Sequence, residues 1–346
     1  MKYFAQILTL FFYVMGVQAD CQITKNMVEN TKRIFTYRNA RGAVALLRTE
    51  RVPHGMKLYM VCTERDVVET QCQDNGRFTE PLPMSCDEPM KPSVMQGRDS
   101  HCTKTLYIVG YMMQGQQLEL FRTCYDRPNG RALYSQSDVH YKSYIPMRQM
   151  VDFEMDQIIT PAQAAAYKKG KIYAKFKRIF GNTQTYVPNP LNVVINRGHL
   201  VASADFLFAD QMVSTFRYIN VVPQFKSIND GNWKRIENWV RSRVNAQKPY
   251  RIRTGAIDDL SLRDQNGNLK RVSLYDSTLN VPKWIYKSVF DTQGNGIYVF
   301  LSYNNIFESR RPPPPSTCQP VECPLILENN PNDGFIFCCN PTNFRY

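Results

Sequence analysis

The stretch that decides the fold runs from Asn196 to Arg241 and reads NRGHLVASADFLFADQMVSTFRYINVVPQFKSINDGNWKRIENWVR. The preceding residues 193–195 are apolar and β-branched, which predicts a buried strand that delivers the Asn-Arg-Gly-His tetrapeptide at its end. Residues 216–222 have the same character and predict a second strand. After Pro223-Gln224 the chain is expected to turn.

A helix is predicted to begin at Asn229, directly after this turn. Apolar side chains recur at helical spacing over residues 233–244, so one face of the helix is expected to be buried. Glu237 and Arg241 stand one turn apart elsewhere on the helix and can pair with each other. The order strand, strand, helix therefore predicts that polar groups from three elements converge.

The polar residues of the tetrapeptide suit metal-assisted cleavage of a phosphodiester. Such a reaction needs a group that removes a proton from the attacking water and groups that relieve charge on the phosphoryl oxygens. His199 suits the base role, because a neutral imidazole has a reference pKa of about 6.5. Gly198 lets a bulky anion approach the backbone, and Arg197 offers a planar fork for phosphate oxygens. A glycine turn that ends in a packed histidine would explain the tetrapeptide equally well.

The expected metal site depends on few ligands. The central segment contains no dense carboxylate cluster and no His-x-x-x-His pattern. A hard cation such as Mg²⁺ keeps most of its waters and can be held by very few protein oxygens. The side-chain oxygen of Asn229 is the expected sole direct ligand, and Glu237 is expected to accept hydrogen bonds from metal-bound water. Asn220 either orients the His199 loop or caps a turn.

The two ends of the chain have the character of a secreted protein. An early lysine, a short apolar run over residues 7–17 and small residues before Asp20 predict a signal peptide that is cut after Ala19. The run is too short to cross a bilayer comfortably, so a membrane anchor is not expected. Up to five disulfides of unknown connectivity are expected from the ten cysteines, because their number is even and none lies in the middle of the chain. They are Cys21, Cys62, Cys72, Cys86, Cys102, Cys124, Cys318, Cys323, Cys338 and Cys339.

Cysteine spacing and turn-rich stretches suggest the domain organisation. A zinc site is disfavoured, because no Cys-x-x-Cys pair faces a second such pair. We expect an α+β fold with a mixed, largely antiparallel sheet in the middle of the chain. The expected parts are a signal peptide (1–19), a disulfide-rich N-terminal β module (20–124), a central domain (125–310), and a Pro-rich connector with a Cys-rich tail (311–346).

The charge favours a polyanionic partner. The formal net charge is +13, which fits nucleic acid, a heparin-like glycan or an anionic lipid surface. A basic run over residues 168–178 is interleaved with aromatic residues and can track a phosphate backbone. Lys175, Lys177 and Arg178 are its candidate contacts. A solvated helix face would explain the run as well.

The spacing of three motifs resembles the DNA/RNA non-specific endonucleases of the ββα-metal class. The motifs are the tetrapeptide at 196–199, Asn-x-x-Pro-Gln at 220–224 and Asn-x-Gly-x-Trp-x-x-x-Glu at 229–237. Residues 254–255 and 281–287 also look like that family's pattern. Together with the signal peptide and the cysteine-rich ends, the chain is most similar to secreted arthropod nucleases, including salivary and digestive ones.

The resemblance, which covers roughly residues 125 to 305, implies a ββα-metal core and a role for each motif residue. His199 would be the general base, Asn229 the single protein ligand of Mg²⁺ (or Mn²⁺), and Glu237 the partner of a metal water. Arg197 and Arg241 would contact phosphate or the active-site carboxylate, and Asn220 would support the site.

The resemblance also implies a substrate class: DNA and often RNA, cut with little sequence preference to leave 5′-phosphates. One feature departs from the family's pattern: the motif commonly begins with Asp, where this chain has Asn196. The family also uses an upstream arginine near the substrate, for which Arg178 is the best candidate. A secreted nucleic-acid-binding protein of the same fold that has lost catalysis is the alternative function. A glycan- or lipid-binding protein would rest on charge alone.

Overall fold

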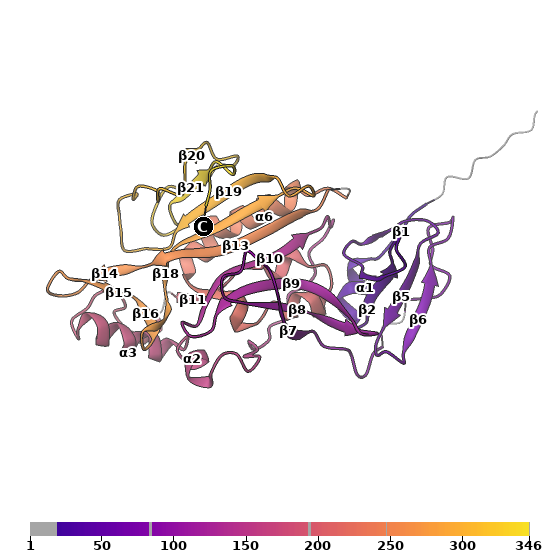
Figure 1. Cartoon of the computed structure of the whole chain (residues 1–346), viewed down its shortest axis with the longest axis horizontal. Coiled ribbons are helices and arrows are strands. Elements are labelled where there is room, and N and C mark those ends of the chain that lie inside the picture. Colours follow the sequence, from indigo (N-terminus) through magenta and orange to yellow (C-terminus); the bar gives the residue numbers. More distant parts are fainter. Residues whose placement is uncertain (1–18, 83–84, 193–194, 247, 346) are drawn as a thin grey trace, which may run out of the picture.

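A nine-stranded antiparallel sheet forms the centre of the molecule, in the order β20-β21-β19-β18-β13-β10-β9-β8-β7 (Figure 1). This computed structural model describes residues 19–82, 85–192, 195–246 and 248–345. The expected signal peptide, up to residue 18, and the apolar pair 193–194 lie outside the described residues. The strands of the sheet are β7 (Ser93–Gly97), β8 (Thr105–Met113), β9 (Gln116–Asp126), β10 (Arg131–Val139), β13 (Tyr250–Asp259), β18 (Pro282–Phe290), β19 (Gly296–Tyr303), β20 (Pro320–Val321) and β21 (Ile336–Cys339).

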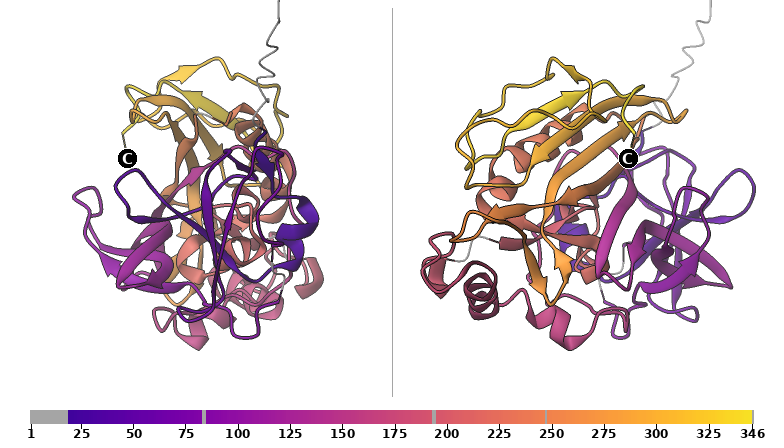
Figure 2. Two further views of the ribbon diagram at one scale, coloured as in Figure 1. Left: turned by 90° about the vertical axis from the view of Figure 1, so that its right-hand side faces the viewer. Right: turned by 60° about the vertical axis from the view of Figure 1, so that its left-hand side comes forward.

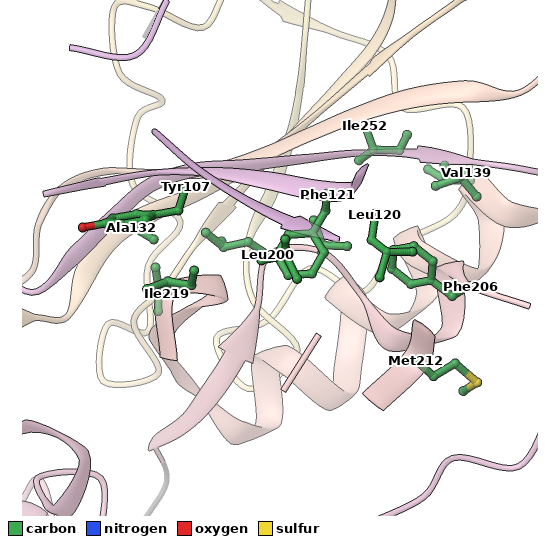
Figure 3. Packing of buried hydrophobic residues seen from close by; sticks show 14 of the residues in the cluster. Tyr107, Leu120, Phe121, Ala132, Val139, Leu200, Phe206, Met212, Ile219 and Ile252 are labelled. Carbon is green, nitrogen blue, oxygen red and sulfur yellow. The ribbon is translucent and has the colours of Figure 1, made fainter. Parts of the chain in front are cut away.

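The two faces of this sheet are covered differently, because successive residues of a strand point to opposite sides. On β18, Ile285 and Val289 face the helices and join the main core, whereas Trp284 and Tyr286 face the C-terminal tail. Figure 3 shows the helix side of the sheet, where side chains of β9 and β10 face Leu200, Phe206 and Ile219 from the segment that follows β11. Figure 2 shows the tail lying over the opposite side of β18 and β19. The sheet with its few helices confirms the α+β class.

The site-bearing segment forms a ββα unit on the helix side. β11 (Ile195–His199) pairs with β12 (Val221–Phe225), and α5 (Lys226–Ile228), η4 (Asn229–Trp233) and α6 (Lys234–Arg243) follow. Two boundaries differ from expectation. The Asn-Arg-Gly-His tetrapeptide forms most of strand β11 and does not come after the end of a strand. The strand expected at 216–222 begins only at Val221. Residues 218–220 instead form the tight turn η3 (Tyr218–Asn220), since the buried Asn220 amide binds nearby backbone groups.

A second, four-stranded sheet forms the N-terminal module, in the order β3-β2-β5-β6. The boundary expected at residue 124 falls inside β9, so residues 93–124 largely belong to the central sheet and not to this module. The core of the module includes Leu207 and Phe208 from the central part of the chain, and the Phe208 ring stacks on Phe35 at 4.9 Å. The module is therefore packed onto the segment that follows β11. Its elements are β1 (Cys21–Gln22), α1 (Lys25–Asn30), β2 (Ile34–Arg38), β3 (Val44–Leu46), β4 (Arg51–Val52), β5 (Lys57–Val61) and β6 (Val67–Gln71).

All ten cysteines form disulfides, which confirms the expected five and leaves no thiolate for a zinc site. Three lie in the N-terminal third and two in the tail. The pairs are Cys21–Cys72, Cys62–Cys86, Cys102–Cys124, Cys318–Cys339 and Cys323–Cys338.

The remaining elements are short, apart from one helix. Thr160 caps α2 (Pro161–Ala165), with Gln163 N donating to its hydroxyl at 3.2 Å. The basic run forms α3 (Lys169–Phe180), which buries its apolar face. In the described residues no helix has the length and apolarity needed to cross a membrane. The other elements are η1 (Pro190–Asn192), η2 (Ser203–Asp205), α4 (Ala209–Ser214), β14 (Ser261–Arg263), β15 (Leu269–Arg271), β16 (Ser273–Tyr275) and β17 (Thr278–Asn280).

The Phe208→Ala substitution should weaken the packing of the N-terminal module against the central part of the chain. Because Phe208 is fully buried in the core of the module, its truncation leaves a cavity and should lower the free energy of unfolding by about 3–5 kcal/mol. Denaturant unfolding of the oxidised protein measures this. Leu269→Ala, at a side chain that is 64% exposed, is the control and should change stability by less than about 0.5 kcal/mol. A loss below about 1 kcal/mol for Phe208→Ala would contradict the packing.

Candidate active site

His199 lies at the end of β11 on a bed of aromatic rings. Its imidazole centroid is 5.3 Å from that of Phe153 and 5.0 Å from that of Phe216. The Nε2 atom is buried and meets no hydrogen-bond partner among the described residues. Burial, together with the positive charges of Arg148 and Arg197, lowers the pKa of His199 to about 3. The imidazole is therefore neutral at physiological pH, with one nitrogen left to accept a proton.

Two guanidinium groups flank the histidine on the same aromatic bed. Arg197 lies 4.3 Å above the Phe153 ring and donates to the Tyr218 hydroxyl at 3.2 Å. Arg148 lies 4.6 Å above the ring of Phe216. Because stacking on a ring fixes a guanidinium and leaves its edge free to donate, this arrangement favours an anion beside the histidine. Arg148 is thus an arginine upstream of the motif that lies beside His199, whereas Arg178 lies on α3.

Asn220 holds the chain that follows His199. Its side chain is fully buried, and its Nδ2 atom donates to the carbonyls of Val201 and Thr215, both at 3.0 Å. Its Oδ1 atom accepts from Val201 N at 3.0 Å, and Leu200 N donates to the Asn220 carbonyl at 2.9 Å. Of the two roles expected for this amide, orientation of the His199 loop is the one that these contacts support.

Gly198 is needed for a different reason than expected. A Cβ atom at this position would lie 2.3 Å from Oε1 and 2.7 Å from Cβ of Gln224, which is fully buried on the paired strand. The space beside the glycine is therefore filled by the protein and does not admit an anion to the backbone. The glycine lets β11 approach β12 closely.

The expected metal ligand, Asn229, lies in the helical segment before a kink. Its Nδ2 atom donates to Oδ1 of Asp230 at 3.2 Å, and no described residue hydrogen-bonds its Oδ1 atom. At Gly231 the backbone leaves helical geometry, with φ −87° and ψ −122°. Asn229 and Glu237 consequently lie on two helical pieces, rather than on the single regular helix predicted from the sequence.

The C-terminal tail holds this kink in place. Asn232, fully buried, donates through Nδ2 to the carbonyls of Glu328 and Gly334, both at 2.8 Å, and accepts from Glu328 N at 3.0 Å. Its backbone N–H donates to the carbonyl of Asp333 at 3.2 Å. A Cβ atom at Gly231 would lie 2.7 Å from Oδ1 of Asp333, so only glycine fits beneath the tail.

Glu237 lies among charged groups of both signs. Burial raises the pKa of its carboxyl group and Asp205 adds to this, whereas Lys287, Arg241 and Arg148 oppose it. The expected pair between Glu237 and Arg241 is not formed. Arg241 donates instead to Oδ1 of Asp205 and to Oδ1 of Asn238, both at 2.7 Å, because Asp205 is brought to it from η2.

Lys287 adds a buried cation beneath the helix. Its Nζ atom donates to the Thr254 hydroxyl at 2.9 Å and lies 5.3 Å from the ring centroid of Trp233. Burial lowers its pKa, while the carboxylates of Glu237 and Asp205 act in the opposite direction. Thr254 and Lys287 lie in the two later stretches that resemble the family, which is the sequence signal for them. Arg148 lies in an irregular segment without a motif, so no sequence pattern identifies it.

The candidate contacts on α3 form a separate surface. Lys175 and Arg178 line a groove of about 390 Å³ together with Lys171, and Lys175 Nζ donates to the carbonyl of Asp276 at 2.7 Å. Lys177 lies 5.5 Å from the ring centroid of Tyr173. The structure does not bring these three side chains to His199, but α2, which precedes α3, borders the site.

The described residues contain no group of three or more His, Cys, Asp or Glu side chains that is close enough to hold a metal. A divalent ion at this site would therefore depend on the Asn229 amide oxygen, the Glu237 carboxylate and water. Such an all-oxygen, water-rich set suits Mg²⁺ or Mn²⁺ better than zinc, which prefers nitrogen and sulfur.

Several known proteins are similar to this chain in sequence. The sequence model of the DNA/RNA non-specific endonuclease family matches residues 102–344. The salivary endonuclease of Lutzomyia longipalpis is 34% identical over 206 residues, 58% of this chain and 49% of that protein. Salivary protein Tsal1 of Glossina morsitans morsitans is 30% identical over 154 residues, 43% of this chain and 38% of that protein.

A solved structure of an EndoG/EndoGI complex gives a TM-score of 0.38 at 18% identity, covering 57% of this chain and 76% of that one. The chain spans about half the length of the salivary endonuclease that it matches. The family match nevertheless covers most of the chain, from Cys102 to the end of the tail. The chain belongs to the DNA/RNA non-specific endonuclease family.

Proposed function

We propose that this chain is a secreted, Mg²⁺- or Mn²⁺-dependent endonuclease that hydrolyses DNA and RNA with little sequence preference and leaves 5′-phosphates. The observation that carries the proposal is the neutral His199, whose buried Nε2 atom lacks a partner and which lies between two stacked guanidiniums. The signal peptide expected before Asp20, the five disulfides and the salivary relatives support secretion.

His199 acts as the general base. Its low pKa keeps the imidazole unprotonated, and Nε2 is the atom we assign to take the proton of the attacking water. The environment that lowers this pKa is apolar and cationic, so a weak base is placed where an anionic substrate will bind. The negative charge of the bound phosphodiester then offsets the two arginines and makes the imidazole a stronger base in the complex.

Asn229 and Glu237 are the residues that would hold the divalent ion, Asn229 through its amide oxygen and Glu237 through its carboxylate and bound water. When bound, the ion supplies charge relief at the phosphoryl and leaving oxygens. Lys287 opposes the effect of burial on the pKa of Glu237 and so favours the charged carboxylate. Arg241 donates to Asp205, so its role is to position that carboxylate near Glu237 rather than to bind phosphate.

Arg197 and Arg148 bind the phosphate oxygens beside His199, and Lys175, Lys177 and Arg178 on α3 contact the backbone further along. These contacts recognise phosphate rather than base edges, which fits a nuclease without strong sequence preference. The net charge of +13 supports binding of either nucleic acid.

The His199→Ala variant tests the assignment of the base. General-base catalysis contributes about 100- to 10,000-fold, so cleavage of plasmid DNA with Mg²⁺ should fall by that factor, with DNA affinity in EDTA retained. His54→Ala, in the N-terminal module, is the matched control and should cut normally. Undiminished cleavage by His199→Ala would refute this base. A wild-type protein that binds DNA but cuts with no divalent ion would instead be a binding protein of the same fold.

The pH profile of kcat/KM should lack a limb near 6.5. This profile reports the free enzyme, in which the His199 pKa is about 3, so the base stays unprotonated and His199 should contribute no limb between about pH 5 and pH 8. Arg148→Gln removes a positive charge that disfavours the imidazolium and should therefore raise the pKa and shift the acid limb upward. Intrinsic fluorescence at each pH checks that the protein stays folded. A wild-type limb with its midpoint near 6.5 would contradict this account.

The Asn232→Ala variant should weaken Mg²⁺ binding, although Asn232 is not one of the expected metal ligands. Loss of the bonds to the tail frees the kink that aims Asn229, so the Mg²⁺ concentration for half-maximal activity should rise about ten-fold. Asn305→Ala is the control, because Asn305 is also buried and its amide bonds Tyr303 and Phe307 instead. It should lower thermal stability with little change in the Mg²⁺ requirement. An unchanged requirement in folded Asn232→Ala would rule out positioning by the tail.

A further inference from the structure

The segment that carries Arg148 is a braced loop. Residues 141–150, the Arg148 loop, leave the end of β10 and run along the N-terminal module without forming a helix or strand. The Ser143 N–H donates to Glu50 Oε1 at 2.8 Å, and the Tyr144 hydroxyl donates to the carbonyl of Ile23 at 2.7 Å. The Met147 N–H donates to Glu29 Oε1 at 2.6 Å. Three bonds to one module therefore fix the loop on both sides of residue 145.

The apolar side chains of this loop face solvent. Ile145 is 47% exposed, Met147 73% and Met150 86%, although Arg148 between them reaches the ring of Phe216 beside His199. Single exposed apolar residues are ordinary, but here three fall within six residues and bracket a candidate phosphate-binding arginine. A braced loop cannot turn these side chains inward, so they stay at the surface next to the site.

Resting on the proposed function, we propose that the Arg148 loop is a substrate-binding element, in which Met147 and Met150 pack against the sugars and base edges of a DNA duplex at its minor groove. A phosphate held by Arg148 brings its own nucleotide and the neighbouring ones against the loop. Between phosphates, a nucleic acid presents sugar C–H groups and, where a base step opens, the apolar faces of the bases. Methionine and isoleucine are among the residues that enter the minor groove and wedge between base steps.

Methionine suits a nuclease with little sequence preference. Its unbranched, polarisable side chain adapts to surfaces of different shape and forms no hydrogen bonds that would select a base. The contact therefore adds affinity without adding sequence preference. The N-terminal module gains a function by the same argument, because Glu29, Glu50 and Ile23 hold the loop at the groove.

The salt dependence of binding separates an apolar contact from a phosphate contact. Each phosphate neutralised by a side chain contributes about −0.9 to the slope of log K against log salt concentration, whereas an apolar contact releases no counterions. The test uses the full-length His199→Ala protein, which keeps the DNA intact, and a fluorescent 30-base-pair duplex whose dissociation constant is measured by anisotropy over a series of salt concentrations.

In this background, Met147→Ser/Met150→Ser should raise the dissociation constant about ten-fold with an unchanged slope. Arg148→Ala should also weaken binding but lower the magnitude of the slope by about 0.9. Leu269→Ser/Ile326→Ser is the matched control, since these side chains are 64% and 97% exposed elsewhere on the surface, and it should bind as the parent does.

A dissociation constant of Met147→Ser/Met150→Ser within two-fold of the parent, at equal thermal stability, would overturn the inference. So would a loss of affinity accompanied by a change of slope, or an equal loss in the Leu269→Ser/Ile326→Ser control. If the double variant bound DNA normally but lost binding to anionic lipid vesicles, the loop would be a membrane contact instead. Cleavage by the wild-type protein is measured separately, so failure of the proposed function is distinguishable from failure of this inference.

Discussion

The hydrogen bonds between the Asn232 amide and the C-terminal tail are the constraint on which the geometry of the site depends. They cross from the middle of the chain to residues 328–334 and hold a backbone kink that no regular helix would adopt. The tail can serve as a fixed partner because two disulfides fasten it to its own strand β21, which pairs with β19 of the central sheet. A buried amide with all its bonds satisfied strongly specifies one arrangement, since each broken bond would leave a desolvated polar group.

The N-terminal module provides the corresponding support on the other side of the site. It binds the loop that carries Arg148, and its core takes in Phe208 from the segment that follows His199. The two cysteine-rich ends, which the sequence predicts as separate parts, thus pack against the ββα unit and its neighbouring segments from two sides. Disulfide-stapled supports suit this site, because its own elements are short and much of its surface is polar and must remain hydrated.

Local patterns predicted the parts of this structure that depend on local chemistry. The order of two strands and a helix in the central segment and the buried face of α6 follow from residue type and spacing, although the strand bounds do not. The kink at Gly231 and the partner of Arg241 did not, because they depend on Asp333 and Asp205, which other segments bring into contact. Arg148 was beyond prediction for the same reason: its loop has no periodicity, and its position is set by bonds to the N-terminal module.

The charges that act on His199 come from arginines and not from the position that begins its motif. The cations that act on the imidazole are Arg148 and Arg197, and both disfavour its protonation. Asn196 lies three residues before His199 in β11, so the two side chains point to opposite faces of the strand. A carboxylate at position 196 would therefore act on the imidazole only at long range, where its effect on the pKa is small. In the proposed mechanism the histidine is neutral in the free protein, and the negative charge that strengthens it as a base is that of the bound phosphodiester.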